Sequence, residues 1–410
     1  MINKTFCVLP WVHVAVKTGG SFRLCCNHST LPQDLEMGGL LKGKHVTDTS
    51  VAEMWNSRSY RELRKRMIKG EPSGPCGRCY REEESGMRSA RMSNNADWLN
   101  RIGDIDPNGF ASLDSIQYVD IRLGNKCNLK CRMCNPYSSN RWIEDEKILH
   151  CRDVPDDNLK SLEKVDWFNS DFFWDNLFSA MKNCKVLYIS GGEPTLFTEQ
   201  QFKLFDKCIE AGISKNILIR YNTNLTTDVS VFEKYWRHFR HIKINCSIDG
   251  FGKVNDYIRY PSRWKTIEKN LLAVYNLVES KKFPISTKVM ATPQMYNIFD
   301  LVNLFDYLKQ FKLFPYLNIL NQPEHYNIRV LKKEQKETVD RIINDWYKKN
   351  EEWLIKNDSR LKSYEKLEKL VEYMWKEDWS HLYADFLKEA RALDELRNQK
   401  LEDYVPELVD

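Results

Sequence analysis

From about residue 115 onward, short apolar segments alternate along the chain with longer amphipathic ones. The short segments have strand length and are rich in β-branched and aromatic residues. The longer segments, such as 198–212 and 261–280, carry apolar residues at helical spacing. Strands that alternate with helices predict βα units and a parallel sheet. Six segments are expected to be strands: 115–123, 185–190, 216–223, 241–248, 285–291 and 316–320.

The chain on either side of this region has a different pattern. Residues 11–26 predict a hairpin, and residues 51–68 predict a helix. After about residue 326 the sequence is charged and helical. This last part is expected to pack on the α/β domain through its tryptophans, with a peptide-binding or subunit-binding surface as the alternative. We expect three domains, with these boundaries: 1–112, 113–325 and 326–410.

Composition and charge set only broad limits. The chain has 410 residues, of which 42% are hydrophobic and 29% charged, and its net charge of +5 is mild. Such a charge does not indicate nucleic-acid binding. No stretch reaches the ~18 apolar residues of a membrane span, and the N-terminus lacks a signal-peptide core. We therefore expect a cytoplasmic protein without a membrane or nucleic-acid partner.

Three of the twelve cysteines lie directly after the first predicted strand. Cys127, Cys131 and Cys134 have the spacing C-x3-C-x2-C, which lets one loop present three thiolates to an iron–sulfur cluster. Structural zinc would recruit a fourth ligand nearby, but the next candidates, His150 and Cys151, begin sixteen residues further on. The pattern predicts a cluster with one open iron, where a substrate or cofactor binds.

A second set of thiols precedes the first strand. Gly20 lies in the turn of the predicted hairpin and would let its strands bring Cys7 and Cys25 together, with Cys26 as the alternative to Cys25. A zinc ion is an alternative occupant, because four-cysteine sites with a C-x2-C half are typical of zinc modules. The set consists of Cys7, Cys25, Cys76 and Cys79. The remaining cysteines are expected to be buried core residues: Cys151, Cys184, Cys208 and Cys246.

The cysteine trio is accompanied by three further motifs in the same order along the chain. GGEP (191–194) follows the second predicted strand, YNTN (221–224) closes the third, and SIDG (247–250) is followed by NDYIRY (255–260). Together with the trio, these motifs resemble the radical S-adenosylmethionine (SAM) superfamily. The resemblance implies a partial (βα)6 TIM barrel, preceded here by a small α+β cluster domain and followed by a helical segment.

The same resemblance implies a chemistry. The open iron of a 4Fe-4S cluster held by Cys127, Cys131 and Cys134 chelates SAM, and an electron from the cluster cleaves it to a 5′-deoxyadenosyl radical. This radical abstracts hydrogen from the substrate. Met133 stands where the superfamily commonly has an aromatic residue. The residues implied to bind SAM are Gly191, Gly192, Glu193, Pro194, Met133, Asn222, Asn224, Ser247 and Arg259.

Strand alternation assigns two faces to the fourth predicted strand. If Ser247 points into the barrel, Asn245 and Lys243 share its side, while Cys246 faces the helices.

The N-terminal thiols also resemble a known module. The order of Cys7, Gly20, Cys25 and the C-x2-C pair is similar to the twitch or SPASM-type auxiliary module, which here precedes the barrel instead of following it. The resemblance implies a second 4Fe-4S cluster that accepts an electron, or that binds substrate if one thiolate is missing. Arg88 and Arg91 lie just downstream and are candidates for contact with substrate or barrel.

Relatives with such a module commonly modify peptides and proteins, so we expect oxidative modification or crosslinking of a peptide or protein. Dehydrogenation of a small alcohol, sugar or aminocyclitol is the alternative. A non-catalytic metal-cluster binding protein is an alternative of another class. The resemblance implies an electron donor such as flavodoxin or ferredoxin. Because the first cysteine is already Cys7, we expect no peptide-recognition element ahead of the cluster domains, which argues against leader-dependent maturation. Candidate substrate-side residues are Gln294, Asn297, Asn321, His325 and Tyr326.

Overall fold

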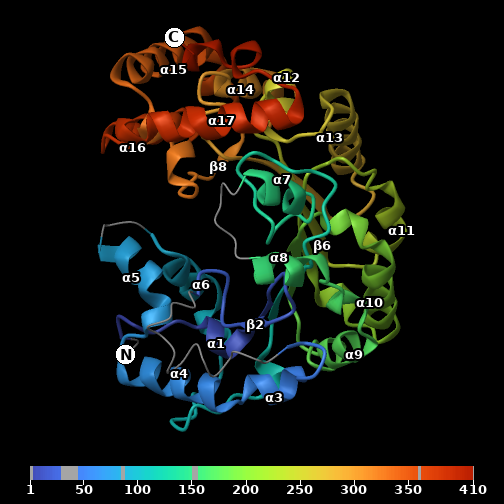
Figure 1. Ribbon diagram of the computed structural model, residues 1–410. Coiled ribbons are helices and arrows are strands. Elements are labelled where there is room, and N and C mark those ends of the chain that lie inside the picture. Colours follow the sequence, from blue (N-terminus) through green and yellow to red (C-terminus); the bar gives the residue numbers. More distant parts are fainter. Residues whose placement is uncertain (1–2, 29–44, 85–87, 150–155, 359–361, 410) are drawn as a thin grey trace. The chain divides into compact units, whose positions relative to one another are not determined.

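The computed structural model describes residues 3–28, 45–84, 88–149, 156–358 and 362–409 (Figure 1). Eight strands form one sheet in the order β2-β1-β3-β4-β5-β6-β7-β8, and the predicted α/β fold with a parallel sheet is confirmed. The six predicted strands are observed as β3 to β8. The strands are β1 (His13–Val16), β2 (Phe22–Arg23), β3 (Tyr118–Leu123), β4 (Val186–Gly191), β5 (Leu218–Thr223), β6 (His241–Ser247), β7 (Ile285–Ala291) and β8 (Tyr316–Leu317).

Helices precede, connect and follow these strands. In the N-terminal part they are α1 (Leu9–Val12), α3 (Val51–Trp55), α4 (Arg58–Lys69), α5 (Gly77–Glu84) and α6 (Ala90–Trp98). In the middle part they are α7 (Trp142–Leu149), α8 (Asp156–Glu163), α9 (Asp171–Ser179), α10 (Thr198–Glu210), α11 (Glu233–Trp236), α12 (Lys253–Ile258), α13 (Trp264–Glu279) and α14 (Leu301–Lys309). The C-terminal helices are α15 (Lys333–Asn357), α16 (Lys362–Trp375) and α17 (Tyr383–Arg397).

The chain divides into two compact units, each built from several stretches of the sequence. The first comprises Met1–Lys126, Ser161–Tyr221 and Phe232–Ile242. The second comprises Cys127–Lys160, Asn222–Val231 and Lys243–Asp410. The boundaries after residues 112 and 325 stay a prediction.

In the first unit, the predicted N-terminal hairpin is part of the main sheet. Strands β1 and β2 pair antiparallel, and β1 also pairs parallel with β3, which places Ala15 opposite Asp120. Gly20 has φ +79° in the hairpin turn, and a Cβ there would overlap the imidazole of His45. The hairpin was predicted from its local pattern, but its pairing with β3 was not, because strand partners are chosen by tertiary contacts.

The expectation of a single helix over residues 51–68 is wrong. The structure has two helices, α3 and α4, because Asn56 leaves the helical conformation between them. The Asn56 side chain donates to the Ala111 carbonyl at 2.9 Å and accepts from the Ala111 N–H at 3.0 Å. These bonds to a distant segment replace the local ones that would continue the helix.

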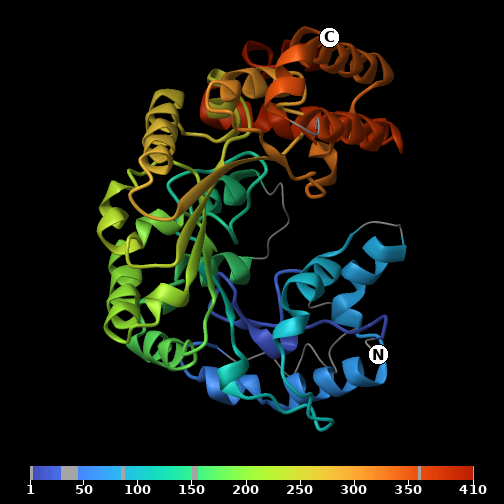
Figure 2. The same ribbon diagram turned by 180° about the vertical axis from the view of Figure 1, so that it is seen from behind.

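One face of strands β3, β4 and β5 forms the apolar core of the first unit. Tyr221 on β5 donates to the side chain of Gln201 on α10 at 2.8 Å, so this face is turned toward that helix. Helices α9 and α10 lie side by side in both views (Figures 1 and 2). The core residues on this face, each at most 1% exposed, are Val119, Ile121, Leu187, Ile189, Ile219 and Tyr221.

In the second unit, the C-terminal helices α15, α16 and α17 lie near one another (Figure 2). Trp346 of α15 is 5% exposed and packs against Phe305 of α14 with ring centroids 5.5 Å apart. Trp375, at 40% exposed, lies largely outside the core. None of the helices in the described part of the chain has the length and apolar character needed to cross a membrane.

Candidate active site

The structure brings the predicted cysteine trio together in one loop after β3. Cys131 interacts electrostatically with both Cys127 and Cys134. The loop is held by hydrogen bonds within itself, since the Cys134 N–H donates to the Cys131 carbonyl at 2.9 Å and the Leu129 N–H to the Cys127 Sγ at 3.4 Å. Asn140 accepts the Cys127 N–H at 3.0 Å. Burial raises the pKa of the Cys131 thiol well above its ordinary value, so a thiolate here needs a compensating positive charge.

The segment after SIDG pairs with the cysteine loop. The backbone N–H of Lys130 donates to the Tyr260 carbonyl at 2.7 Å, and that of Arg132 to the Ile258 carbonyl at 2.8 Å. Arg259, between these two acceptors, forms a buried ion pair with Asp249 at 2.7 Å and interacts electrostatically with Cys131. A guanidinium is therefore held beside the thiols by a carboxylate of the SIDG motif.

The GGEP turn lies against the residues just before the cysteine loop. The Gly192 N–H donates to the Gly124 carbonyl at 3.0 Å, and the Glu193 N–H to the Lys126 carbonyl at 2.9 Å. A Cβ on Gly192 would overlap the Lys126 carbonyl, and one on Gly191, which has φ +137°, would lie 2.7 Å from the Leu123 N. Only glycine lets this turn approach so closely, and Lys126 is covalently joined to Cys127.

The side chain of Glu193 is turned inward. Its carboxylate accepts from the N–H and hydroxyl of Thr195, at 3.1 and 2.6 Å, and the residue is 1% exposed. Pro194 is also buried. The predicted contact of this motif with SAM can therefore come from its backbone, while the carboxylate shapes the turn.

Both asparagines of YNTN are placed by side-chain hydrogen bonds. Asn224 donates to Asn128 at 3.0 Å and approaches the Cys127 Sγ at 3.8 Å. Asn222 accepts from Asn245 at 2.8 Å. Ser247 and Met133 are half-buried. The assignment of these side chains to SAM stays a prediction.

These residues fit a SAM-binding cluster by the chemistry of their donors. The trio in the second unit supplies three soft ligands. In the first unit, the glycines of the GGEP turn pack so closely that a Cβ would not fit. Among the residues that the structure describes, no group of three Cys, His, Asp or Glu side chains could hold a single metal ion. The ligands of a multi-iron cluster stand further apart than those of one ion.

The N-terminal thiols gather in the first unit. Burial raises the pKa of the Cys7 thiol to about 12, and Cys76 and Cys79 act in the same direction. Cys25 interacts electrostatically with Cys7 and Cys76, whereas Cys26 interacts with Cys79. These relations favour Cys25 over Cys26 as the partner of Cys7, and the ligand assignment stays a prediction.

Arg91 is positioned beside this second thiol set. Its Nη1 donates to the carbonyl of Phe6, which precedes Cys7, at 2.9 Å, and its guanidinium pairs with Glu83. Arg88 is exposed. Arg91 therefore supports the Cys7 backbone and adds positive charge near the thiols, a role different from the substrate contact considered from the sequence.

A buried ionic network under the cysteine loop was not predicted. The guanidinium of Arg132, at 0% exposed, pairs with Asp394 of α17 and lies 3.6 Å from the Tyr257 ring centroid. On the other side of Cys131, Lys130 pairs with Asp145 of α7 at 2.6 Å. Asp145 also pairs with Arg397 of α17 at 3.0 Å. We name Lys130, Arg132, Asp145, Asp394 and Arg397 the α17 clamp. The sequence carries no local signal for it, since its members come from segments far apart along the chain.

Helix α17 packs on residues of the α/β domain, as predicted for the C-terminal part, but it does so through charged side chains and not through the predicted tryptophans. Trp142 of α7 donates to the Cys131 carbonyl at 2.8 Å, and the Arg397 guanidinium lies 5.0 Å from the Trp142 ring centroid. Helix α17 is therefore in contact with the residues that hold the cysteine loop.

Most of the predicted substrate-side residues anchor loops. Asn297 donates to the carbonyls of Asp249 and Thr292 at 2.7 and 2.9 Å. The Tyr326 hydroxyl donates to Glu389 of α17 at 2.7 Å, and His325 pairs with the same carboxylate. Gln294 is buried and donates to the Thr292 carbonyl at 3.1 Å, while Asn321 is exposed.

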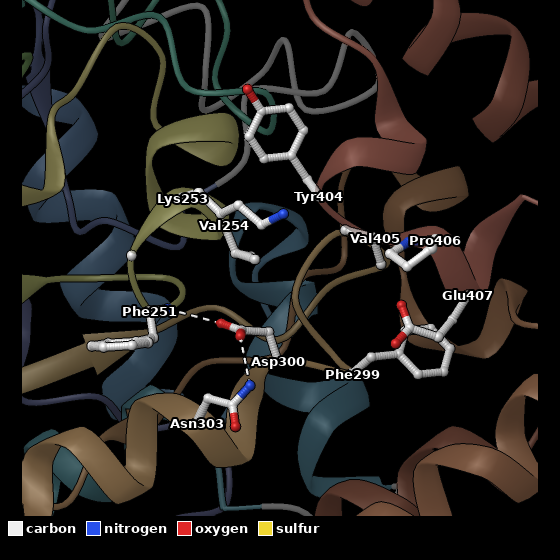
Figure 3. A pocket seen from close by; sticks show the side chains of 11 residues that line it. Phe251, Lys253, Val254, Phe299, Asp300, Asn303, Tyr404, Val405, Pro406 and Glu407 are labelled. Atoms are coloured by element: carbon white, nitrogen blue, oxygen red, sulfur yellow. Dashed lines mark hydrogen bonds between the residues drawn. The ribbon is translucent and has the colours of Figure 1, made fainter.

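A pocket of about 410 Å³ opens beside the end of the SIDG motif (Figure 3). Its lining includes Phe251, Tyr404 and Asp300. Asp300 accepts from the Phe251 N–H at 2.8 Å and from Asn303 at 2.9 Å, as the dashed lines in Figure 3 show. Its carboxylate thus fixes the turn that follows Gly250.

The scattered cysteines behave as predicted where they are described. Cys184, Cys208 and Cys246 are each at most 1% exposed. Cys246 lies 3.2 Å from the Thr287 hydroxyl. Cys151 lies outside the described residues.

Comparison with protein families identifies two domains. The family model described as "Radical SAM superfamily" matches residues 121–307. The SPASM model, described as "Iron-sulfur cluster-binding domain", matches residues 7–80. No curated protein matches the chain.

Several solved structures are similar to parts of the chain. Native anSMEcpe with bound AdoMet is 16% identical, covers 55% of this chain and 58% of its own, and has a TM-score of 0.33. Native anSMEcpe with bound AdoMet and Kp18Cys peptide is 18% identical, covers 57% and 59%, and has a TM-score of 0.35. Streptococcus suis SuiB bound to precursor peptide SuiA is 15% identical, covers 68% and 60%, and has a TM-score of 0.34.

This chain thus spans less than two thirds of the length of these structures. The radical SAM match contains the trio of Cys127, Cys131 and Cys134, and the SPASM match contains the N-terminal set of four thiols. The chain therefore contains a radical SAM domain with a SPASM domain ahead of it, and SAM and iron–sulfur clusters are its cofactors.

Proposed function

We propose that this protein is an enzyme that cleaves SAM reductively and oxidises or crosslinks a peptide or protein. One observation carries the proposal: the chain presents two separate thiol sets, one with three members and one with four. Three thiols leave an iron for SAM, and the second set provides a place for an electron after the substrate has reacted.

The first set would hold the SAM-binding 4Fe-4S cluster through Cys127, Cys131 and Cys134. Bound SAM, once reduced by one electron, supplies a 5′-deoxyadenosyl radical that takes a hydrogen atom from the substrate. The GGEP backbone and the YNTN side chains would orient the methionyl and ribose parts. Arg259, whose charge is kept beside the loop by Asp249, would hold the carboxylate of the cofactor.

The second set would hold the auxiliary 4Fe-4S cluster through Cys7, Cys25, Cys76 and Cys79. Its thiols are buried or half-buried, which keeps water from the site. The guanidinium of Arg91 beside Cys7 would stabilise the negative charge of an electron received there.

A peptide or protein is proposed as substrate because enzymes with this pair of domains commonly modify peptides. Flavodoxin or ferredoxin would donate the first electron.

Cysteine substitutions test the proposal. Replacing Cys127, Cys131 and Cys134 by Ala is expected to abolish 5′-deoxyadenosine formation from SAM in anaerobic assays with dithionite. Replacing Cys76 and Cys79 by Ala is expected to preserve SAM cleavage but to stop product formation. Iron should fall from about eight to about four per chain in each variant, if both sites hold 4Fe-4S clusters.

The matched control is Cys208→Ala, which removes a buried thiol outside both sets. Deuterium transfer from labelled peptide pools or labelled small-molecule pools into 5′-deoxyadenosine identifies the substrate class. SAM cleavage that survives loss of the trio would overturn the proposed function, and transfer only from small molecules would overturn the peptide assignment.

A further inference from the structure

A row of polar side chains crosses the first unit on the sheet face opposite the apolar core. Strand register places Asp120 of β3 opposite Tyr188 of β4, and Tyr188 opposite Arg220 of β5. Arg122 lies one pleat further along β3, opposite Ser190. The residues between them point to the other face, where Ile121, Ile189 and the other core residues pack. The row is therefore not part of the apolar core.

Two polar atoms of this row lack hydrogen-bond partners among the described residues. They are the Asp120 Oδ1 and the Arg220 Nε, and Asp120 is only 3% exposed. An unsatisfied buried carboxylate oxygen is costly, and native proteins rarely keep one without a function. Burial raises the pKa of Asp120 to about 6, although Arg122 and Arg220 lie near enough to oppose this shift.

The row also has an excess of positive charge. Arg122 and Arg220 are accompanied by one carboxylate, and the Arg220 guanidinium lies 5.7 Å from the Tyr188 ring centroid. Arg122 interacts electrostatically with Cys26, so part of its charge acts on the N-terminal thiols. The charges of Arg122 and Arg220 both act on Asp120, so two guanidinium groups face this one carboxylate and can hold a second anion.

The row lies close to two features of the first unit, the GGEP turn and the N-terminal thiols. Arg122 is two residues before Gly124, whose carbonyl accepts the Gly192 N–H of the GGEP turn at 3.0 Å. At its other side, Asp120 interacts electrostatically with Cys26, next to the second thiol set. A group bound on this row would therefore lie near the GGEP turn and the N-terminal thiols of the same unit.

We propose that Asp120, Arg122 and Arg220 form a subsite for a carboxylate-bearing segment of the peptide substrate. The two guanidinium groups take the carboxylate of a Glu or Asp side chain or of a peptide C-terminus. The open oxygen of Asp120 accepts a backbone N–H of the same segment. This inference rests on the proposed function and adds to it a preference for acidic peptides.

The test measures peptide binding without turnover. Two decapeptide libraries, identical except that a central position is Glu in one and Gln in the other, are equilibrated with the SAM-loaded holoprotein in the absence of reductant. Retained peptides are quantified by mass spectrometry. The wild type is expected to retain the Glu library about ten-fold or more over the Gln library, because hydrogen bonds to charged groups contribute at least that factor.

Four variants separate the parts of the subsite. Arg220→Gln and Arg122→Gln are each expected to remove most of the Glu preference, and Arg220→Lys to retain part of it. Asp120→Ala is expected to weaken retention of the neutral Gln library, which reports the backbone N–H contact without a charge effect. The control is Arg237→Gln, an exposed arginine of the same unit whose substitution removes the same charge.

Each outcome decides the inference. Equal retention of the two libraries by the wild type, or no retention of either, would overturn it. A full Glu preference in Arg220→Gln with normal iron content and melting temperature would do the same. SAM cleavage by the same wild-type preparation, measured with dithionite and no peptide, reports separately on the proposed function.

Discussion

The α17 clamp predicts that a residue of the C-terminal helix controls retention of the SAM-binding cluster. Asp394 is 7% exposed, and its Oδ1 pairs with Arg132 and accepts from the Tyr257 hydroxyl at 2.8 Å. Its Oδ2 accepts from the Leu401 N–H at 2.7 Å. In Asp394→Asn the carboxylate charge is lost, so the Arg132 guanidinium is left buried without its counter-ion.

Removing one partner of a buried ion pair costs about 3–5 kcal/mol. Arg132 keeps its bonds to the Tyr257 carbonyl at 3.1 Å and to Gln399 at 3.0 Å, so the loss falls mainly on the electrostatic contact. Because Arg132 lies between Cys131 and Cys134, we expect the cysteine loop to open before the rest of the unit unfolds. If this whole free-energy cost favours the opening of the loop, the equilibrium constant for opening rises about a hundred-fold or more.

The assay follows iron loss to a chelator under anaerobic conditions. It uses the Cys76→Ala and Cys79→Ala background, so that only the SAM-binding cluster contributes. Asp394→Asn is expected to lose iron at least ten-fold faster and to change the electron paramagnetic resonance signal that reports SAM binding. Asp385→Asn, an exposed substitution on the same helix, is the control.

A rescue experiment distinguishes the ion pair from general damage to the helix. Replacing both partners, Arg132→Met with Asp394→Leu, removes the buried charge and should restore much of the cluster retention. Iron loss from Asp394→Asn at the same rate as from Asp385→Asn would refute the reasoning. Failure of the double variant to improve on Asp394→Asn would assign the effect to packing.

Two further predictions concern the turn and the sheet. Gly192→Ala should weaken SAM binding at least ten-fold at unchanged iron content, because its Cβ would overlap the Lys126 carbonyl. The control is Gly19→Ala, which has open space around it and should bind SAM normally. Equal dissociation constants of the two variants for SAM would contradict this prediction. His13 is buried, and burial lowers its pKa to about 4. Below pH 6.5 the unfolded state therefore binds a proton that the native state does not. The free energy of unfolding should fall as the pH drops from 6.5 toward 4, by at most about 1.4 kcal/mol per pH unit. The free energy of unfolding, measured with urea at several pH values between 7.5 and 5.5, should change less with pH in His13→Gln than in the wild type. In the exposed His381→Gln it should change with pH as in the wild type. The same pH dependence in all three proteins would contradict the assignment.

Local sequence was sufficient for the strands and for the thiol sets. The six barrel strands follow from runs of β-branched and aromatic residues, and the trio from its spacing after the first of them. It was not sufficient where a polar side chain bonds to a distant segment. Asn56 interrupts a helix-forming run because it binds the backbone of Ala111, a partner that no local pattern reveals.

The sequence by itself determined that two groups of thiols exist, that one has three closely spaced members, and that a glycine motif follows it along the chain. Spacing within a loop is a property of neighbouring residues, so it can be read along the chain. Only the tertiary structure decided that α17 supports the cysteine loop and that Asp120, Arg122 and Arg220 share one sheet face. Those relations depend on strand register and on the burial of charges far apart in sequence, and both are set by the packing of the whole fold.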